Sequence, residues 1–293
     1  MTRGSIDLGG HTRTYWSAAA PTSAGTNGRM PLLIVLHGAG GQGPGMAALS
    51  GLDRRGPTAG FMTVFPDGVA RVWNDARGAP RLRRREGVDD VAFLQALVDR
   101  LAADGRVRAD GVYLAGISNG GLMSEHLARH GLLPVTGLGL VAGPGTQTSR
   151  AETPRPKQAA TVVVFAGTAD PLVPYAGGPI GFGRGRRRSA AAGRGVAVPA
   201  EVIASDWAAA NGIPGAPVVE GLPRQPGDLP VTRVTWRSDG RPPVVLYRIE
   251  GGGHTWPGGR QYLPARLIGP AARNLDATGL LLEQFLANER PNP

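Results

Sequence analysis

The sequence predicts an α/β fold, with a mostly parallel central sheet flanked by helices on both faces. Short apolar runs alternate along the chain with segments of helical periodicity, an order typical of parallel strands joined by covering helices. The 293-residue chain is 41% hydrophobic and 18% charged, which is the composition of a globular protein long enough to bury a substantial core. We expect one domain over residues 1–293.

The first part of the chain predicts a hairpin and two strands of the central sheet. The hairpin turns at Gly9–Gly10, and a loop over 21–31 leads into an apolar strand over 32–38. A helix over Met46–Arg54 follows, and then a strand over 61–68. This strand–helix–strand order fits the parallel arrangement.

The segment over 87–105 has the periodicity of a helix packed on the sheet. Two aspartates, Asp89 and Asp90, open this helix. Carboxylates in a first helical turn complement the helix dipole and cap free N–H groups, so we predict this role for them rather than a metal site. The apolar face consists of Val88, Val91, Leu94, Val98 and Leu101.

The rest of the chain continues the alternation of strands and helices. A strand, a tight turn and a helix occupy 111–131, and further helices are expected near Val202–Ala210 and over Asn274–Leu286. Four more strands are expected over 137–143, 161–167, 231–236 and 244–250.

The net charge of +10 raises the question of a nucleic-acid partner. However, Lys157 is the only lysine, and arginine accompanies abundant Ala, Gly and Pro, a pattern that fits a GC-rich genome. Aromatic residues make up only 5% of the chain, and no basic stretch is interleaved with stacking residues. No stretch approaches the roughly 20 apolar residues of a membrane span. We therefore predict neither a nucleic-acid nor a membrane partner.

Cysteine is absent, which excludes disulfides, thiolate metal sites and a cysteine nucleophile. The first residues lack the apolar core of a signal peptide. The protein is therefore expected to be either cytoplasmic or secreted after removal of a leader. Any nucleophile must be another residue type.

A serine lies in a pattern typical of a nucleophile elbow. Residues 116–120 read Gly-Ile-Ser-Asn-Gly between an apolar strand and a helix, which is the context that the G-x-S-x-G motif requires. The glycines two residues to either side let the strand and helix approach closely around a strained serine. Ser118 is therefore the predicted nucleophile.

A serine hydroxyl needs a neighbouring base, itself oriented by a carboxylate. His254 follows three glycines after an apolar strand and is the predicted base. Asp170 lies just past a buried strand and precedes His254, as the chain order Ser…Asp/Glu…His of α/β-hydrolases requires. For His126 and His130 we expect surface or capping roles, for His37 a structural one, and His11 lies in the N-terminal hairpin.

The glycine-rich turn after the strand over 32–38 resembles an oxyanion-hole motif. One donor is expected to be the backbone N–H of Asn119, and the second that of Ala39 or alternatively of Gly40. Gly40 is also a candidate substrate-binding residue. For Trp256 we predict a wall of the substrate cleft, and the alternative is that it packs beneath the histidine turn.

Residues 177–199 differ from the rest of the chain and predict a basic, flexible insertion. We hypothesise that Arg184, Arg186, Arg187 and Arg188 lie at the rim of the cleft and attract anionic substrates. The alternative is a solvated loop without functional consequence.

The chain resembles the polyhydroxybutyrate depolymerase-like esterases, a family of α/β-hydrolases with feruloyl and acetylxylan esterase relatives. The resemblance covers nearly the whole chain through segments such as LLIVLHGAGG, VYLAGISNGGLMSEHLA, GTADPLVPYAGG and GGGHTWPGG. It implies a catalytic triad of Ser118, Asp170 and His254, with oxyanion donors near Ala39 and Asn119. Unlike many members, these 293 residues contain no cysteine, and we expect neither a leader nor a polymer-binding module within them.

These observations predict a serine carboxylic ester hydrolase that needs neither a metal nor an organic cofactor. Hydroxyalkanoate oligomers or polyesters, or related short-chain esters, are the leading substrates, and feruloyl or acetylxylan esters are the alternative. A peptidase using the same residues is a more distant reading. A non-catalytic binding protein is the alternative from another class, and it is disfavoured because Ser118, Asp170 and His254 are all present. The sequence leaves the oligomeric state open.

Overall fold

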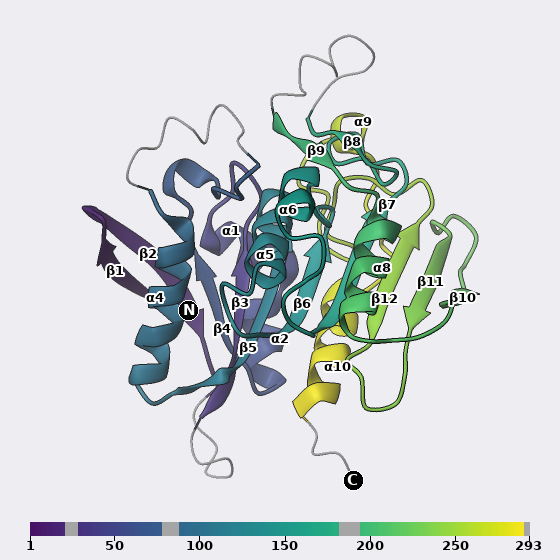
Figure 1. The fold of residues 1–293 in the computed structure, drawn as a ribbon. Coiled ribbons are helices and arrows are strands. Elements are labelled where there is room, and N and C mark those ends of the chain that lie inside the picture. The colour runs from purple at the N-terminus through teal and green to yellow at the C-terminus, as the bar shows by residue number, and fades with distance from the viewer. Residues whose placement is uncertain (21–28, 78–87, 182–193, 290–293) are drawn as a thin grey trace.

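A computed structural model of the chain describes residues 1–20, 29–77, 88–181 and 194–289. Within these residues, ten strands form one twisted sheet (Figure 1). In spatial order they are β1 (Thr2–Leu8), β2 (His11–Ala18), β4 (Met62–Pro66), β3 (Met30–Leu36), β5 (Val107–Ile117), β6 (Val135–Val141), β7 (Thr161–Gly167), β12 (Val244–Ile249), β11 (Val231–Trp236) and β10 (Val218–Gly221).

The centre of this sheet is parallel and its two margins are antiparallel. The pairs from β4 through β3, β5, β6 and β7 to β12 are all parallel. The hairpin β1–β2 joins β4 antiparallel on one side, and β11 and β10 extend the other side antiparallel. The predicted α/β fold is thus confirmed.

Helices cover both faces of the sheet (Figure 1). Helices α4, α5 and α8 pack on one face through the larger core cluster, whereas α1, α2 and α10 pack on the other. The helices are α1 (Gly43–Ser50), α2 (Leu52–Thr58), the 3₁₀ turn η1 (Val69–Arg71), α4 (Asp90–Ala103), α5 (Asn119–Arg129), α6 (Gln147–Glu152), α8 (Ala200–Ala210), α9 (Ala265–Ile268) and α10 (Ala277–Glu289). Among these described helices, none is both long and apolar enough to cross a membrane.

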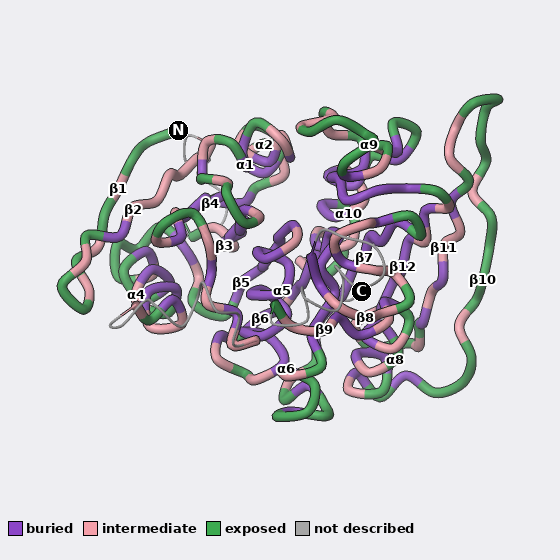
Figure 2. The backbone as a smooth tube through the Cα atoms, turned by 90° about the horizontal axis from the view of Figure 1, so that it is seen from above, coloured by how far each residue is buried: buried purple, intermediate pink, exposed green. Residues whose placement is uncertain are grey.

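Strand β3 shows why its sequence is apolar without alternation. Leu32, Ile34 and Leu36 face the larger core, whereas Leu33 and Val35 face the smaller one. A central parallel strand has helices on both sides, so both sets of side chains are buried. Viewed from above in Figure 2, the interior strands are buried while β1 and β10 are largely exposed.

Several element boundaries differ from the sequence prediction. The single helix expected over Met46–Arg54 is two helices, because Gly51 adopts a left-handed φ of 67° between them. Asp89 caps α4 as predicted, its side chain accepting the Ala92 N–H at 2.9 Å. Asp90 instead lies buried and pairs with Arg13 at 2.6 Å.

The ends of the predicted basic insertion are regular. Strands β8 (Gly178–Pro179) and β9 (Val196–Ala197) pair antiparallel and form a separate two-stranded ribbon. The arginines at 184 and 186–188, to which we assigned a rim position, lie outside the described residues. Their role stays a prediction.

Candidate active site

Ser118 occupies a strained turn between β5 and α5. Its φ of 57° and ψ of −124° lie outside the regions that non-glycine residues favour. A Cβ on Gly116 would lie 2.4 Å from the Gly120 carbonyl, and one on Gly120 would lie 2.3 Å from the Leu36 oxygen. Both positions therefore have to be glycine if strand and helix are to meet this closely. The turn leaves Ser118 at the N-terminus of α5, partly exposed.

Asp170 and His254 form a buried, hydrogen-bonded pair. Nδ1 of His254 lies 2.7 Å from Oδ2 of Asp170, and the two residues are only 2% and 6% exposed, respectively. The other carboxylate oxygen, Oδ1, accepts the backbone N–H groups of Leu172 at 2.7 Å and Val173 at 2.9 Å. Since an ionised carboxylate only accepts, Nδ1 of His254 carries the proton and Nε2 is left as the basic nitrogen.

The turn that carries His254 is fixed by its main chain. Its N–H donates to the Ile268 carbonyl at 2.5 Å, and its carbonyl accepts the Tyr262 hydroxyl at 2.8 Å. A Cβ on Gly253 would lie 2.2 Å from the Ile268 oxygen, so glycine is needed there for close approach rather than for mobility. The turn is also joined to the segment before Asp170, because Ala169 N–H donates to Gly252 O at 3.0 Å.

Ser118, Asp170 and His254 follow β5, β7 and β12, three parallel strands whose carboxyl ends lie at the same edge of the sheet. Ligand sites of open α/β sheets form at that edge. In the described part of the chain no hydrogen bond joins the Ser118 hydroxyl to His254. Hydrogen bonds between catalytic groups are often long without substrate and shorten in the complex.

The backbone N–H groups of Ala39 and Asn119, the predicted oxyanion donors, have no hydrogen-bond partner among the described residues, and neither do those of Gly120 and Gly121 in the first turn of α5. The Gly40 N–H instead donates to the Arg71 carbonyl at 2.7 Å. This bond removes Gly40 as the alternative donor that the sequence left open. Gly40 itself is exposed, with a left-handed φ of 87°.

His37 holds the loop before Ala39, as its predicted structural role requires. Its Nε2 accepts the Gly68 N–H at 3.0 Å and its Nδ1 donates to the Gly38 carbonyl at 2.8 Å. Burial lowers the pKa of His37, which together with these bonds fixes it as a neutral ring. Its carbonyl accepts the indole N–H of Trp73 at 2.9 Å.

The predicted position of Trp256 in a cleft wall is corrected by the structure. The side chain is 1% exposed, and its indole N–H donates to Thr278 of α10 at 3.0 Å. It belongs to the core cluster between the sheet and α10. A side chain this buried fits the alternative that the sequence left open, which is packing beneath the histidine turn.

The surface role expected for His126 is also wrong. Every residue of α5 is buried, including the charged residues Glu125 and Arg129, which pair with each other. His126 is 7% exposed, its ring centre is 4.4 Å from that of His130, and its Nδ1 has no partner among the described residues. Burial and the neighbouring His130 lower the pKa of His126 to about 4. His130, less buried, ends the helix.

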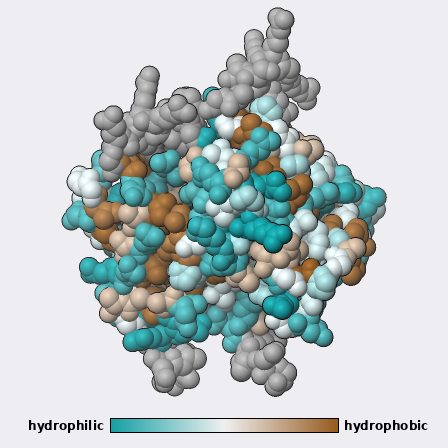
Figure 3. Space-filling view, viewed as in Figure 1, coloured by the Kyte–Doolittle hydropathy of each residue, from teal (hydrophilic) through white to brown (hydrophobic). Residues whose placement is uncertain are grey.

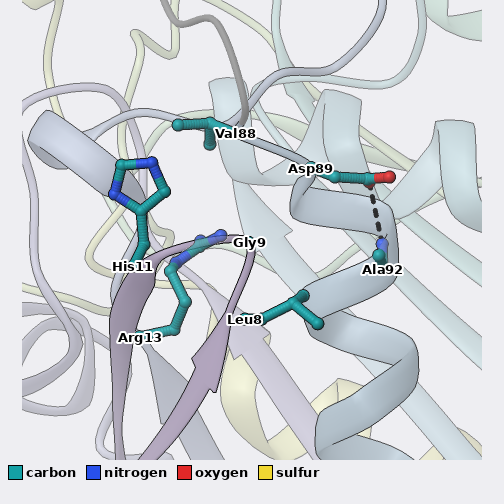
Figure 4. A pocket seen from close by; sticks show the side chains of 7 residues that line it. All are labelled: Leu8, Gly9, His11, Arg13, Val88, Asp89 and Ala92. Atoms are coloured by element: carbon teal, nitrogen blue, oxygen red, sulfur yellow. Dashed lines mark hydrogen bonds between the residues drawn. The ribbon is translucent and has the colours of Figure 1, made fainter.

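A cavity of about 230 Å³ lies away from this site, between the β1–β2 hairpin and the start of α4. Figure 4 shows His11 and Arg13 of β2 on one side of it and Val88 and Asp89 on the other, with the Asp89 carboxylate turned toward the Ala92 N–H. On the face seen in Figure 3, apolar surface gathers on this side of the molecule, near α4. None of Ser118, Asp170 and His254 lines the cavity. Among the described residues there is no group of three or more side chains suited to hold a metal ion.

The fold is that of an α/β-hydrolase. No family model matches the chain. The chain is 33% identical over 288 residues to the protein named "Putative esterase NocK" from Nocardia uniformis subsp. tsuyamanensis, and the match covers 96% of this chain and 81% of that protein. This chain therefore belongs to the same esterase family. The acetyl xylan esterase from Aspergillus awamori shares the fold, with a TM-score of 0.56 and 14% identity over 87% of this chain and 94% of that one.

Proposed function

We propose that this esterase hydrolyses carboxylic esters through an acyl-serine intermediate, with Ser118 as nucleophile, His254 as general base and Asp170 as the orienting carboxylate. The observation that carries the proposal is the buried 2.7 Å pair of His254 and Asp170, at the sheet edge where the strained Ser118 turn lies. The N–H groups of Ala39 and Asn119, which have no partner among the described residues, support the proposal as candidate oxyanion donors.

The proposed reaction uses the Ser118 hydroxyl and Nε2 of His254, the nitrogen that is not bonded to Asp170. The Ser118 hydroxyl oxygen adds to the ester carbonyl carbon while Nε2 of His254 takes the hydroxyl proton. The tetrahedral intermediate collapses, the carbon–oxygen bond to the alcohol breaks, and His254 returns the proton to the departing alcohol. Water then attacks the acyl-serine by the same route and releases the acid. Asp170 stays ionised and stabilises the imidazolium that forms twice in each cycle.

The N–H groups of Ala39 and Asn119 would hold the negative charge that develops on the carbonyl oxygen. Donors already fixed in position lose nothing to reorganisation when the charge appears, and removing one such donor typically costs about 10²–10³ in kcat. Asn119 is the first residue of α5, so the positive end of the helix dipole adds to the same field.

Short-chain hydroxyalkanoate esters or oligomers are the proposed substrate class. Leu122, one helical turn after Ser118, packs with Val173 and Ile180 in a small apolar cluster that Leu172 borders. Leu172 and Val173 are the residues whose N–H groups hold Asp170. Leu172 is the partly buried member of this group and lies two residues after Asp170, and an apolar side chain there suits a short aliphatic acyl group. Acetylated or feruloylated polysaccharide is the alternative, which an assay separates directly.

The test is a side-by-side assay of p-nitrophenyl acyl esters of increasing length, hydroxybutyrate oligomers, amorphous polyhydroxybutyrate, methyl ferulate and acetylated xylan. The proposal expects the highest kcat/KM on short acyl esters and hydroxybutyrate oligomers, and no activity in Ser118→Ala. A clear preference for methyl ferulate or acetylated xylan would move the assignment to the alternative. Turnover by Ser118→Ala at the wild-type rate would overturn the mechanism.

A further inference from the structure

The segment over 70–77 is held in an unusual backbone conformation beside the site. Ala70, Arg71 and Ala76 have left-handed φ values of 46°, 64° and 59°. Side chains other than glycine and asparagine rarely adopt this conformation, which persists only where the surroundings enforce it. Apart from Ser118 and Ala142, these are the only non-glycine residues with positive φ in the described ranges.

This segment is hydrogen-bonded both to the turn that carries Ala39 and to the side chain of Asn119. On the Ala39 side, Arg71 accepts the Gly40 N–H and the Trp73 indole donates to His37. On the other side, the Asn119 side chain bonds both backbone groups of Trp73: Oδ1 accepts its N–H at 2.7 Å and Nδ2 donates to its carbonyl at 3.0 Å. One short segment therefore connects the turn after β3 to the first residue of α5.

Asp75 completes the connection. Its Oδ2 accepts a second hydrogen bond from Nδ2 of Asn119 at 2.8 Å, and the residue is only 1% exposed. Its Oδ1 lies 3.1 Å from Nε of Arg77. Both amide hydrogens and the amide oxygen of Asn119 are thereby engaged, so the side chain has a single orientation. Because Ser118 precedes it directly, fixing Asn119 fixes the position of its own N–H relative to Ser118.

We propose that Asp75 is a positioning residue for the oxyanion hole, which, through the side chain of Asn119, aligns the Asn119 N–H with the oxyanion. This inference rests on the proposed ester hydrolysis. Asp75 does not touch the reacting atoms, and its effect passes through one side chain. A donor misplaced by about 1 Å costs on the order of 100-fold in rate, so loss of Asp75 has a catalytic consequence larger than its effect on binding.

Removal of Asp75 leaves the segment attached elsewhere. Asp90 accepts the Asn74 N–H at 2.7 Å and is held by Arg13, and Trp73 is fully buried. The neighbouring chain thus stays anchored when the Asp75 carboxylate is lost. Glu125 provides a matched control. It is also a buried carboxylate paired with an arginine, and it lies on α5 like Asn119 but is bonded to Ser149 of α6.

The experiment compares Asp75→Ala, Asp75→Asn and the control Glu125→Gln with the wild type, well below each unfolding midpoint. For each protein kcat and KM are measured on a p-nitrophenyl ester, and Ki is measured for phenylboronic acid, whose tetrahedral serine adduct places an oxygen in the oxyanion hole. Asp75→Ala is expected to lower kcat about 10- to 100-fold and raise Ki in parallel, with KM changed less than about threefold. Asp75→Asn has one acceptor oxygen for two sets of donors, Nδ2 of Asn119 on one side and Arg77 on the other, so it should recover part of kcat. Glu125→Gln should lower the unfolding midpoint and leave kcat unchanged.

A double-mutant cycle supplies the second measurement. If Asp75 acts through Asn119, Asn119→Ala and Asp75→Ala lose similar factors in kcat, and the double variant loses little more than either alone. Additive losses, or a wild-type kcat in Asp75→Ala accompanied only by a lower unfolding midpoint, would overturn the proposal. Should Asp75→Ala fail to fold, Asp75→Asn is compared with the single variant Asn119→Asp, which keeps Asp75 and so sets two carboxylates against each other. The proposal expects Asn119→Asp to lower kcat more than Asp75→Asn does, and a kcat no lower than that of Asp75→Asn would overturn it.

Failure of the proposed function has a different signature. In that case the wild-type protein neither hydrolyses esters nor reacts with a fluorophosphonate at Ser118. Failure of the Asp75 proposal alone leaves both of these wild-type properties intact.

Discussion

Replacing Asp170 with Asn changes one atom and should switch the tautomer of His254. In the native pair, all three nearby N–H groups point at the carboxylate: two backbone amides at Oδ1 and the imidazole Nδ1–H at Oδ2. An Asn side chain has one oxygen and one NH₂ group to place in these two positions. Its orientation decides which nitrogen of His254 carries the proton.

The backbone amides determine the orientation of this Asn. Placing the NH₂ group against the Leu172 and Val173 N–H groups would leave two buried donors unpaired, at a cost of about 1–3 kcal/mol each. The amide oxygen therefore takes the Oδ1 position, and the NH₂ group faces Nδ1 of His254. Nδ1 must then accept, so the proton moves to Nε2, the nitrogen that has to take the Ser118 proton.

The expected loss is about 10⁴-fold in kcat, the effect known for this tautomer change in serine hydrolases, which corresponds to about 5.4 kcal/mol of transition-state stabilisation. The change should appear in kcat rather than KM, and thermal unfolding should shift little because the shape of the side chain is kept. Asp206→Asn is the control, since Asp206 also pairs with charged groups, Arg129 and Arg150, but lies on α8. It should keep the wild-type kcat.

The assay is steady-state hydrolysis of the preferred p-nitrophenyl ester with an active-site count by fluorophosphonate. If Asp170→Asn retains more than about a tenth of the wild-type kcat, then the hydrogen-bonded pair does not set the protonation of the base, and the reasoning from the two amides is refuted.

Three further predictions concern other parts of the molecule. Burial lowers the pKa of His126 to about 4, so between about pH 4 and 6.5 the unfolded chain binds a proton that the folded chain does not. The free energy of unfolding should therefore fall by up to about 3 kcal/mol as the pH drops through this window. Denaturant unfolding of His126→Gln should lack this part of the pH dependence. Trp256→Ala should lower stability by about 3–5 kcal/mol and reduce all ester rates alike, whereas a change in substrate preference at an unchanged unfolding midpoint would restore the wall interpretation. EDTA should leave turnover unchanged, and an activity that EDTA removes and zinc restores would contradict the serine mechanism.

Sequence patterns predicted those features that depend on local signals. The central strands are largely apolar, and the Ser118 turn carries glycines at the two positions where a Cβ would collide with backbone. Asp170 lies three residues past β7 and His254 five residues past β12, and the shared edge of parallel strands brings their side chains to within 2.7 Å. Each of these inferences needed only neighbouring residues and the rule that parallel strands end together.

Other features depend on contacts that are distant in the sequence. Helix α5 carries Glu125 and Arg129, which suggest an exposed face, yet both are buried because they pair with each other and Arg129 also reaches Asp206 of α8. Ala70 and Arg71 adopt left-handed backbone conformations although neither is glycine, so the sequence does not indicate them. Asp75 meets Asn119 from 44 positions away, so no local pattern assigns it to the site.

The direction in which the Trp256 side chain points could not be predicted from the sequence. Trp256 lies two residues past His254, and this proximity suggested a position in the cleft wall. The glycine-rich turn has no regular periodicity, so the sequence does not show which way the side chain points. In the structure the indole points to Thr278 and the core. The same absence of periodicity explains why Gly40 could not be separated from Ala39 as a donor until the bond from Gly40 to Arg71 was seen.

The central claim, that Ser118 is an activated nucleophile, is tested most directly by reacting the protein with a fluorophosphonate and identifying the modified peptide by mass spectrometry. The account predicts stoichiometric modification at Ser118, loss of esterase activity in proportion, and no labelling of Ser118→Ala. Labelling of a different residue, or undiminished esterase activity in Ser118→Ala, would contradict it.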